Sequence, residues 1–225
     1  MKHSTIIIAL ALVLAIFLCL LSYRYFFKSW TPYYQEKLYK EPRPLLIEAL
    51  KLFEQFPNKE KKALDLGSGV GNDTAFLLKN GWQVWANDVE REAIDIIASR
   101  KDVQDYKEKL ILVHKDFVDL PWRDFPKFDL IYASYALPFA RRNDFMKIWE
   151  HIVQELSSGG IFAGHFFGPG HGAFNWWIKR KMTFLTKDQL LEMFKDFKIE
   201  FFNEFYEKNN SGIFNHSFDV IAKKI

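Results

Sequence analysis

The stretch ALDLGSGVGND, residues 63–73, decides how the rest of this chain is interpreted. A short apolar run that contains Asp65 leads into glycines at alternate positions, Gly67, Gly69 and Gly71. Glycine lets the backbone turn tightly and lets a ligand lie against it, because no Cβ stands in the way. We therefore interpret residues 67–71 as a ligand-binding loop between a buried strand and a helix.

The segments around this loop alternate between strand and helix patterns. Short apolar segments predict strands at 62–66, 82–88, 110–116, 128–135 and 161–168. Segments with helical spacing predict helices at 43–56, 73–81, 90–101, 144–156 and 186–197, the fourth of them stopped by SSGG at 157–160 and the last begun by a capping box of Thr186 and Gln189. Two final strand candidates, 198–206 and 214–224, suggest an antiparallel hairpin at one edge of the sheet. Alternation of this kind predicts an α/β fold with a doubly wound, mostly parallel seven-stranded sheet covered on both faces.

Composition limits the other possibilities. With 225 residues, of which 49% are hydrophobic, the chain can bury one sizeable core. Basic and acidic residues are interleaved and the net charge is only +3, a pattern typical of solvated surface and not of a nucleic-acid-binding track. Cys19 is the only cysteine, so neither an intrachain disulfide nor a cysteine cluster for zinc can form.

The N-terminus is a separate feature. Residues 5–23 carry no charge, and about nineteen residues at roughly 1.5 Å each approach the thickness of a bilayer core. The alternative, a cleaved signal peptide, lacks a small-x-small cleavage site. We expect one transmembrane helix in an anchor segment at 1–28, followed by a catalytic domain at 29–225.

The charges that flank this segment predict its orientation. Lys2 precedes it, whereas Arg24, Lys28, Lys37 and Lys40 follow it. Positive charge gathers on the cytoplasmic side of membrane proteins, so we expect a single-pass membrane protein whose catalytic domain lies in the cytoplasm.

The residues beside the glycines exclude two phosphate-binding loops. The dinucleotide-binding pattern requires glycine where this chain has Asn72, and the Gly-Lys-Ser/Thr of a P-loop is absent. Asp65 would repel a pyrophosphate but attract a cation. A nicotinamide-dependent oxidoreductase is therefore a poor interpretation, and a ligand with an ammonium and a sulfonium group is a better one.

LDLGSGVG, followed by Asp88 at the end of the next predicted strand, resembles the nucleotide-binding half of class I S-adenosylmethionine-dependent methyltransferases, whose pattern is D-x-G-x-G-x-G. The resemblance continues through HKDFVDLPW, FDLIYASYALPF, LSSGGIFAGHFFG and MTFLTKDQLLEMF and covers roughly residues 40–225. The last three stretches are most similar to the branch of tellurite-resistance and related small-molecule methyltransferases. The resemblance implies a Rossmann-like fold and S-adenosylmethionine as the cofactor.

The resemblance also implies residue roles. The three glycines would face the methionine and ribose portion of the cofactor, Asp65 would help to hold the methionine end, and Asp88 would accept both ribose hydroxyls. Asp116 would bind the adenine amino group, with Phe117 against the ring. Asp88 could instead be a helix N-cap, and Asp116 could be a solvated loop acid.

Four further residues concern the transfer itself. Ser134 and Tyr135 would border the reactive methyl group, although aromatic residues in a buried strand usually serve packing. His165 and His171 lie at and after the end of the fifth predicted strand, where the acceptor should bind. Histidine is the usual proton acceptor near neutral pH. We take Tyr135 and His165 as catalytic candidates. With no third ligand nearby, we expect no metal, and an acceptor that is already anionic would need no base.

Residues 174–181 combine tryptophans with basic residues, a composition that suits either an anionic membrane surface or a mobile lid. The sequence therefore predicts a membrane-anchored S-adenosylmethionine-dependent methyltransferase with a small-molecule acceptor, which could be lipophilic. The alternative is a non-catalytic scaffold or sensor that binds S-adenosylmethionine.

Overall fold

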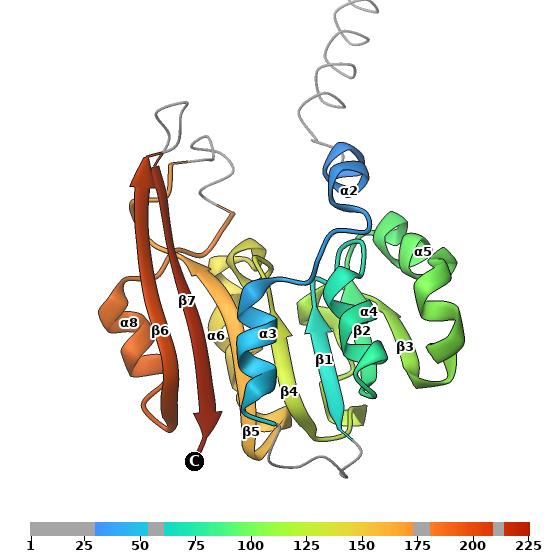
Figure 1. The fold of residues 1–225 in the computed structure, drawn as a ribbon. Helices are drawn as coiled ribbons and strands as arrows, with labels where there is room; N and C mark the ends of the chain where they lie inside the picture. Colours follow the sequence, from blue (N-terminus) through green and yellow to red (C-terminus); the bar gives the residue numbers. More distant parts are fainter. Residues whose placement is uncertain (1–29, 54–60, 173–180, 209–213) are drawn as a thin grey trace, which may run out of the picture. The chain divides into compact units, whose positions relative to one another are not determined.

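The computed structural model describes residues 30–53, 61–172, 181–208 and 214–225 (Figure 1). The chain forms two compact units, Met1–Lys37 and Leu38–Ile225. In the first unit, helix α2 spans Thr31–Lys37. The predicted transmembrane segment at 5–23 lies outside the described residues. In the part of the chain that is described, no helix is both long and apolar enough to cross a bilayer.

The second unit is built on a seven-stranded sheet with the order β3-β2-β1-β4-β5-β7-β6. Its first five strands in sequence pair in parallel, and β7 lies antiparallel between β5 and β6. This confirms the predicted mostly parallel sheet with a C-terminal hairpin. The strands are β1 (Lys62–Leu66), β2 (Gln83–Asp88), β3 (Leu110–His114), β4 (Phe128–Ala133), β5 (Leu156–Phe167), β6 (Phe197–Lys208) and β7 (Phe214–Lys224).

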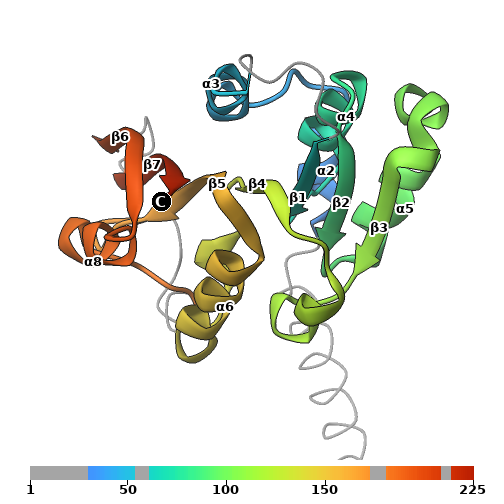
Figure 2. The same cartoon turned by 90° about the horizontal axis from the view of Figure 1, so that it is seen from below.

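Helices cover both faces of this sheet, as Figure 2 shows from below. One face packs against α3 (Pro44–Lys51), α4 (Asn72–Lys79) and α5 (Arg91–Ser99). The other face packs against α6 (Arg142–Glu155) and α8 (Lys187–Met193). Short 3₁₀ segments complete the unit: η1 (Lys101–Lys109), η2 (Phe117–Asp119), η3 (Trp122–Asp124) and η4 (Leu137–Phe139).

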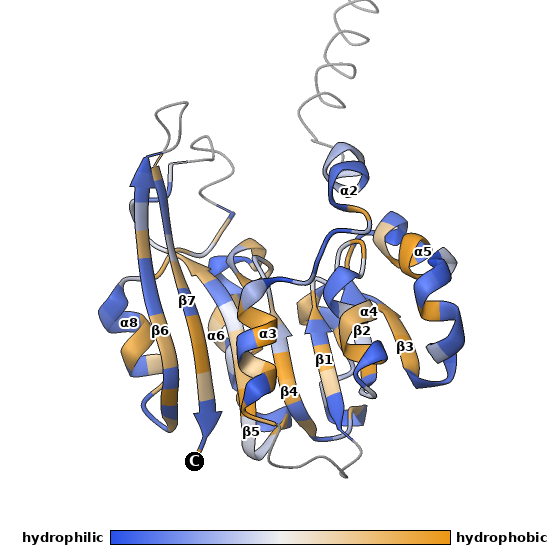
Figure 3. Ribbon diagram, viewed as in Figure 1, coloured by the Kyte–Doolittle hydropathy of each residue, from blue (hydrophilic) through white to orange (hydrophobic). Residues whose placement is uncertain are grey.

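The core consists of two apolar clusters, one on each face of the sheet. Neighbouring residues of β4 point to opposite faces, so Ile131 belongs to one cluster and Tyr132 to the other. Strand β4 is buried along its whole length because it is covered on both faces, and Figure 3 shows hydrophobic residues predominating there. On the α6 side, the Trp149 ring meets Phe162 and Phe194 edge to face, with centroids 5.1 and 4.8 Å apart. Such pairs contribute about 0.5–1.5 kcal/mol each beyond the area they bury.

One predicted boundary is wrong, and one local prediction is confirmed. Residues 157–160 do not separate a helix from a strand, because β5 already begins at Leu156. The pairing of β5 with β4 shifts between Phe128 and Leu130, so the intervening residues of β5 form an irregularity in the strand. The predicted capping box at the start of α8 is present, with Thr186 and Gln189 bonded reciprocally.

The strand order determines where a ligand can bind. The chain moves outward from β1 through β2 to β3 and then returns to place β4 on the other side of β1. In open α/β sheets, ligands bind at such a reversal, beyond the carboxyl ends of the strands. The glycine loop follows the carboxyl end of β1, at this position.

Candidate active site

The glycine loop has the backbone that its sequence predicts. Gly67, Gly69 and Gly71 adopt φ angles of 67°, 53° and 75°, a region that side chains disfavour. A Cβ at Gly67 would lie 2.5 Å from Ala136 Cβ, and one at Gly71 would lie 2.6 Å from Ile97 Cγ1. A Cβ at Gly69 would meet nothing within 4 Å. Gly67 and Gly71 thus permit close packing inside the protein, whereas Gly69 faces open space that a ligand can use.

A buried arginine fixes this loop from behind. Arg100 is 3% exposed, and its Nη1 donates to Val70 O at 2.8 Å and to Asn72 Oδ1 at 2.7 Å. The same guanidinium binds both oxygens of Asp102 and lies over the ring of Tyr39. Asn72, which departs from the dinucleotide-binding pattern, therefore has a structural role as an acceptor for Arg100.

Two acids lie beneath the loop. Asp65 is 2% exposed and accepts a 2.6 Å hydrogen bond from the hydroxyl of Thr74. Burial, together with the neighbouring Asp73 carboxylate, raises the pKa of Asp65 to about 8. Burial also raises the pKa of Asp73, although this carboxylate accepts the backbone N–H of Arg43 at 2.8 Å. A bound cation would relieve this clustering of buried carboxyl groups.

Asp88 ends β2 and is held by the loop. Its Oδ2 accepts the backbone N–H of Gly69 at 2.8 Å, and its Oδ1 accepts that of Glu90 at 2.9 Å. The side chain is 7% exposed. Burial raises its pKa, although these hydrogen bonds act to lower it. Asp88 is not the N-cap of α5, a position that Glu90 occupies. Each carboxylate oxygen retains acceptor capacity beyond its amide bond, which is what two ribose hydroxyls would require.

Asp116 and Phe117 follow β3, which lies on the same side of β1 in the sheet as β2. Asp116 is exposed and caps η2, where its Oδ1 accepts the N–H of Val118 at 3.2 Å. A Cβ at Gly67 would lie 3.8 Å from Phe117 Cζ, so this ring reaches the loop. The structure therefore brings Phe117 to the glycines and leaves the Asp116 side chain in solvent.

Ser134 and Tyr135 follow β4 directly, and both are half-buried. Tyr135 has a φ angle of 51°, which is unusual for a residue with a bulky side chain. Its ring stacks on that of His165 with centroids 4.1 Å apart, and the Arg43 guanidinium lies over it at 4.8 Å. The two predicted catalytic residues are therefore in direct contact.

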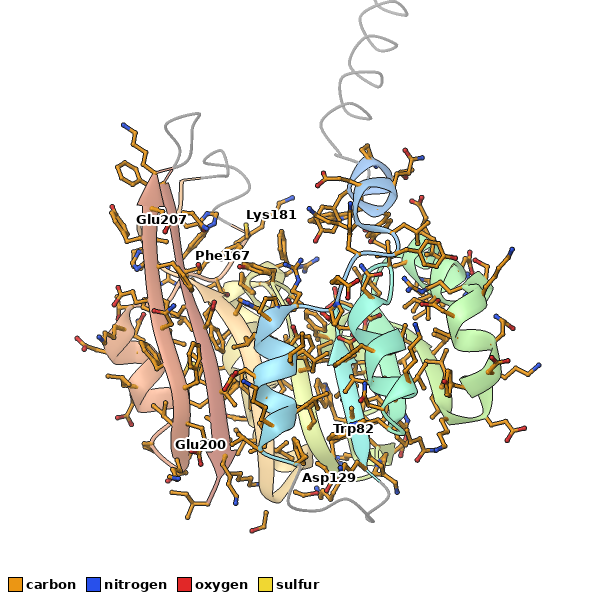
Figure 4. All side chains as sticks on the ribbon, viewed as in Figure 1. Trp82, Asp129, Phe167, Lys181, Glu200 and Glu207 are labelled. Atoms are coloured by element: carbon orange, nitrogen blue, oxygen red, sulfur yellow. The ribbon has the colours of Figure 1, made fainter. Side chains whose placement is uncertain are left out.

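An aromatic cluster extends from this stack. Phe167, at the end of β5, stacks on His171 with centroids 4.0 Å apart and also contacts Tyr135, Phe139 and Phe184. Figure 4 shows Phe167 towards the carboxyl ends of the central strands, at the opposite end of the sheet from Asp129. We define these five residues with His165 as the aromatic cluster. Ligand sites are commonly lined in this way, by apolar and aromatic side chains with a few polar groups.

Sequence reasoning missed several residues that shape the site. Asp73 lies in the opening motif, but its pKa and its bond to Arg43 depend on the tertiary structure. Asp219, which lies 3.5 Å from His165, could have been found only by predicting the register of the hairpin. Arg100 carried no signal beyond its position near the end of a predicted helix.

Comparison with known proteins finds similarity over parts of the chain. Residues 64–164 match a family model described as a methyltransferase domain. A mitochondrial ribosomal RNA small subunit methyltransferase from Arabidopsis thaliana is 32% identical over 71 residues, which make up 32% of this chain and 18% of that protein. The match thus spans far less than two thirds of that relative.

Solved structures share the fold. TehB from Haemophilus influenzae superposes with a TM-score of 0.66 at 17% identity, over 80% of this chain and 61% of that one. The 1,6-didemethyltoxoflavin-N1-methyltransferase of Burkholderia thailandensis, solved with bound 1,6-didemethyltoxoflavin and S-adenosylhomocysteine, gives a TM-score of 0.58 at 21% identity, over 80% of this chain and 78% of that one. At these identities, the likeness establishes the architecture.

Proposed function

We propose that this chain, which carries a class I S-adenosylmethionine-dependent methyltransferase domain, transfers a methyl group to a small-molecule acceptor bound at the aromatic cluster. The fold shared with TehB and with a small-molecule N-methyltransferase supports an acceptor of this size, and it agrees with the resemblance in sequence to the tellurite-resistance branch. S-adenosylmethionine supplies an electrophilic methyl group on a positively charged sulfur.

The observation that carries the cofactor part of the proposal is the combination of Gly69 with Asp65 and Asp88. Gly69 leaves room beside the backbone, and the two acids lie at the ends of the neighbouring strands β1 and β2. Asp88 would bind the ribose hydroxyls, Asp65 would favour the ammonium of the methionine end, and Phe117 would contact the adenine. Hydrogen bonds to a charged acceptor of this kind contribute about 1.5–3 kcal/mol each.

The acceptor would lie against the residues that follow β4 and β5. Tyr135 and His165 are polar groups at the edge of an otherwise apolar lining, so they would orient the acceptor while Phe167 and its neighbours exclude water. Exclusion of water and fixed orientation are the main contributions that a protein makes to a displacement of this type.

A product assay tests the proposal. Wild-type protein is incubated with methyl-labelled S-adenosylmethionine and a panel that contains a phenol, an arylamine, a thiol, selenite and tellurite. We expect label to appear in at least one acceptor together with an equal amount of S-adenosylhomocysteine. Tight binding of S-adenosylhomocysteine without label transfer to any compound would instead favour the non-catalytic scaffold.

We further propose that residues 5–23 anchor the protein as a single-pass membrane protein with the catalytic domain in the cytoplasm. Support comes from the uncharged length of this segment and from the excess of basic residues after it. Protease added to intact spheroplasts should leave the domain uncleaved, and membrane disruption should make it cleavable. Release of the full-length chain from membranes by carbonate would refute the anchor.

A further inference from the structure

A buried histidine and a partly buried aspartate face each other across β5 and β7, beside the aromatic cluster. His165 and Asp219 are direct cross-strand partners, and His165 Nε2 lies 3.5 Å from Asp219 Oδ1. Neither this oxygen nor His165 Nδ1 forms a hydrogen bond within the described part of the chain. A buried polar group without a partner costs about 1–3 kcal/mol, so two such groups side by side point to a role other than packing.

The pair is linked to the end of β4 through Tyr135. The Tyr135 ring stacks on His165 at an interplanar angle of 15°, and its backbone is held in the left-handed region. Backbone strain of this kind persists where the surrounding structure enforces it, and it gathers at active sites. The imidazole of β5 is thus in contact with the segment that follows β4 and lies beside a carboxylate of β7.

We infer that His165 is the general base of methyl transfer and that Asp219 positions it, an inference that rests on the function proposed above. The negative charge of Asp219 beside Nε2 favours the imidazole tautomer that carries its proton on Nε2, and Nδ1 is then the proton acceptor. The hydroxyl proton of the acceptor passes to Nδ1, and a lone pair of that oxygen forms the new bond to the methyl carbon. The bond from the methyl carbon to sulfur breaks with its electrons left on sulfur, while Asp219 offsets the imidazolium charge.

This assignment identifies a substrate class. A base is needed only if the reacting atom carries a proton at working pH, which excludes an acceptor that is already anionic. The rings of Phe139, Phe167 and Phe184 belong to the same aromatic cluster as His165 and suit a flat aromatic molecule. The acceptor is accordingly a phenol-type hydroxyl on a planar ring system.

The charges around the imidazole set its protonation state in the ligand-free protein. Burial and the Arg43 guanidinium lower the pKa of His165 to about 3, and burial raises the pKa of Asp219 to about 6. At neutral pH, the imidazole is therefore neutral and the carboxylate is ionised. The titratable or charged groups that face the ring are Arg43 at the start of α3, Tyr135 after β4, and Asp219 on β7. Activity should fall as pH decreases through about 6, where Asp219 takes up a proton.

The test compares two phenols. The hydroxyl of 2-naphthol stays protonated at neutral pH, whereas 4-nitrophenol ionises there without a base. His165→Asn should slow methylation of 2-naphthol at least about 100-fold, the lower range for general-base catalysis, and should slow that of 4-nitrophenol less than about tenfold. Asp219→Asn should slow methylation of 2-naphthol and remove the decline in rate below pH 6.

Asp129→Asn is the matched control, because Asp129 is a buried carboxylate at the opposite end of the sheet that accepts the Lys62 N–H at 3.0 Å. This variant should keep the wild-type rate and pH profile. Calorimetry with S-adenosylhomocysteine should give the same affinity for all three variants, which shows that the site is folded. Equal losses on both phenols would make His165 a structural residue, and wild-type protein that binds S-adenosylhomocysteine but methylates neither phenol would overturn the inference. Failure to bind S-adenosylhomocysteine would instead refute the proposed function.

Discussion

At the scale of single residues, the three glycines of the loop have different roles. Gly67 and Gly71 are required because a side chain would collide with Ala136 or Ile97. Gly69 has free space beside it, so its value lies in leaving that space to a ligand.

This difference gives a prediction. Gly69→Ala should lower the free energy of unfolding by only about 1 kcal/mol, the cost of a left-handed residue with a Cβ, yet weaken S-adenosylhomocysteine binding at least about tenfold. Gly81 is the matched control, because it also has a positive φ of 85° and open space around it, but it lies after α4, away from the loop. Gly81→Ala should cost similar stability and leave binding unchanged. Equal binding losses in both variants would contradict the role assigned to Gly69.

Asp65 gives a second prediction at this scale. Its folded-state pKa of about 8 lies above the ordinary value of 3.8, so the ligand-free protein should lose stability as pH rises between these values. The ammonium of a bound cofactor favours the ionised form, and binding at pH 7 should therefore release protons. Calorimetry of S-adenosylhomocysteine binding in buffers of different ionisation enthalpy measures this release. Asp65→Asn should reduce the release, whereas unchanged release would assign it to another group.

At the scale of elements, the sequence predicts what depends on local patterns. Periodicity and glycine spacing predict the strands and helices that flank the loop, and Thr186 with Gln189 predicts the start of α8. Contacts between distant segments are not encoded locally. The approach of Asp219 to His165 depends on the register of β7 against β5, in which a shift of one residue would move every side chain to the other face.

The same limit applies around the loop. Arg100 binds the backbone of Val70, which lies thirty positions earlier in the chain. Nothing in the sequence around Arg100 indicates that it holds the glycine loop. Gly159 and Gly160 predict a turn before β5, whereas pairing with β4 draws this segment into the sheet, so that β5 begins at Leu156. Tertiary pairing overrides local preference in such cases.

At the scale of the whole molecule, the sheet order brings the two halves of the proposed reaction together. Strands β1 and β2 present Asp65 and Asp88 on one side of the reversal, and β4 and β5 present Tyr135 and His165 on the other. A cofactor along the first pair of strands would direct its methyl group towards the second pair. The fold thus accounts for the separation of cofactor residues and acceptor residues along the chain.

The most direct measurement is calorimetric titration of S-adenosylhomocysteine into wild-type protein, Asp88→Ala and Asp105→Ala. Asp105 is an exposed acid in η1, so its replacement removes the same charge outside the site. The account predicts one cofactor per chain for wild type, the same affinity for Asp105→Ala, and an affinity at least about tenfold weaker for Asp88→Ala, which loses the acceptor for two ribose hydroxyls. No binding to wild type, or equal affinity of Asp88→Ala, would contradict it.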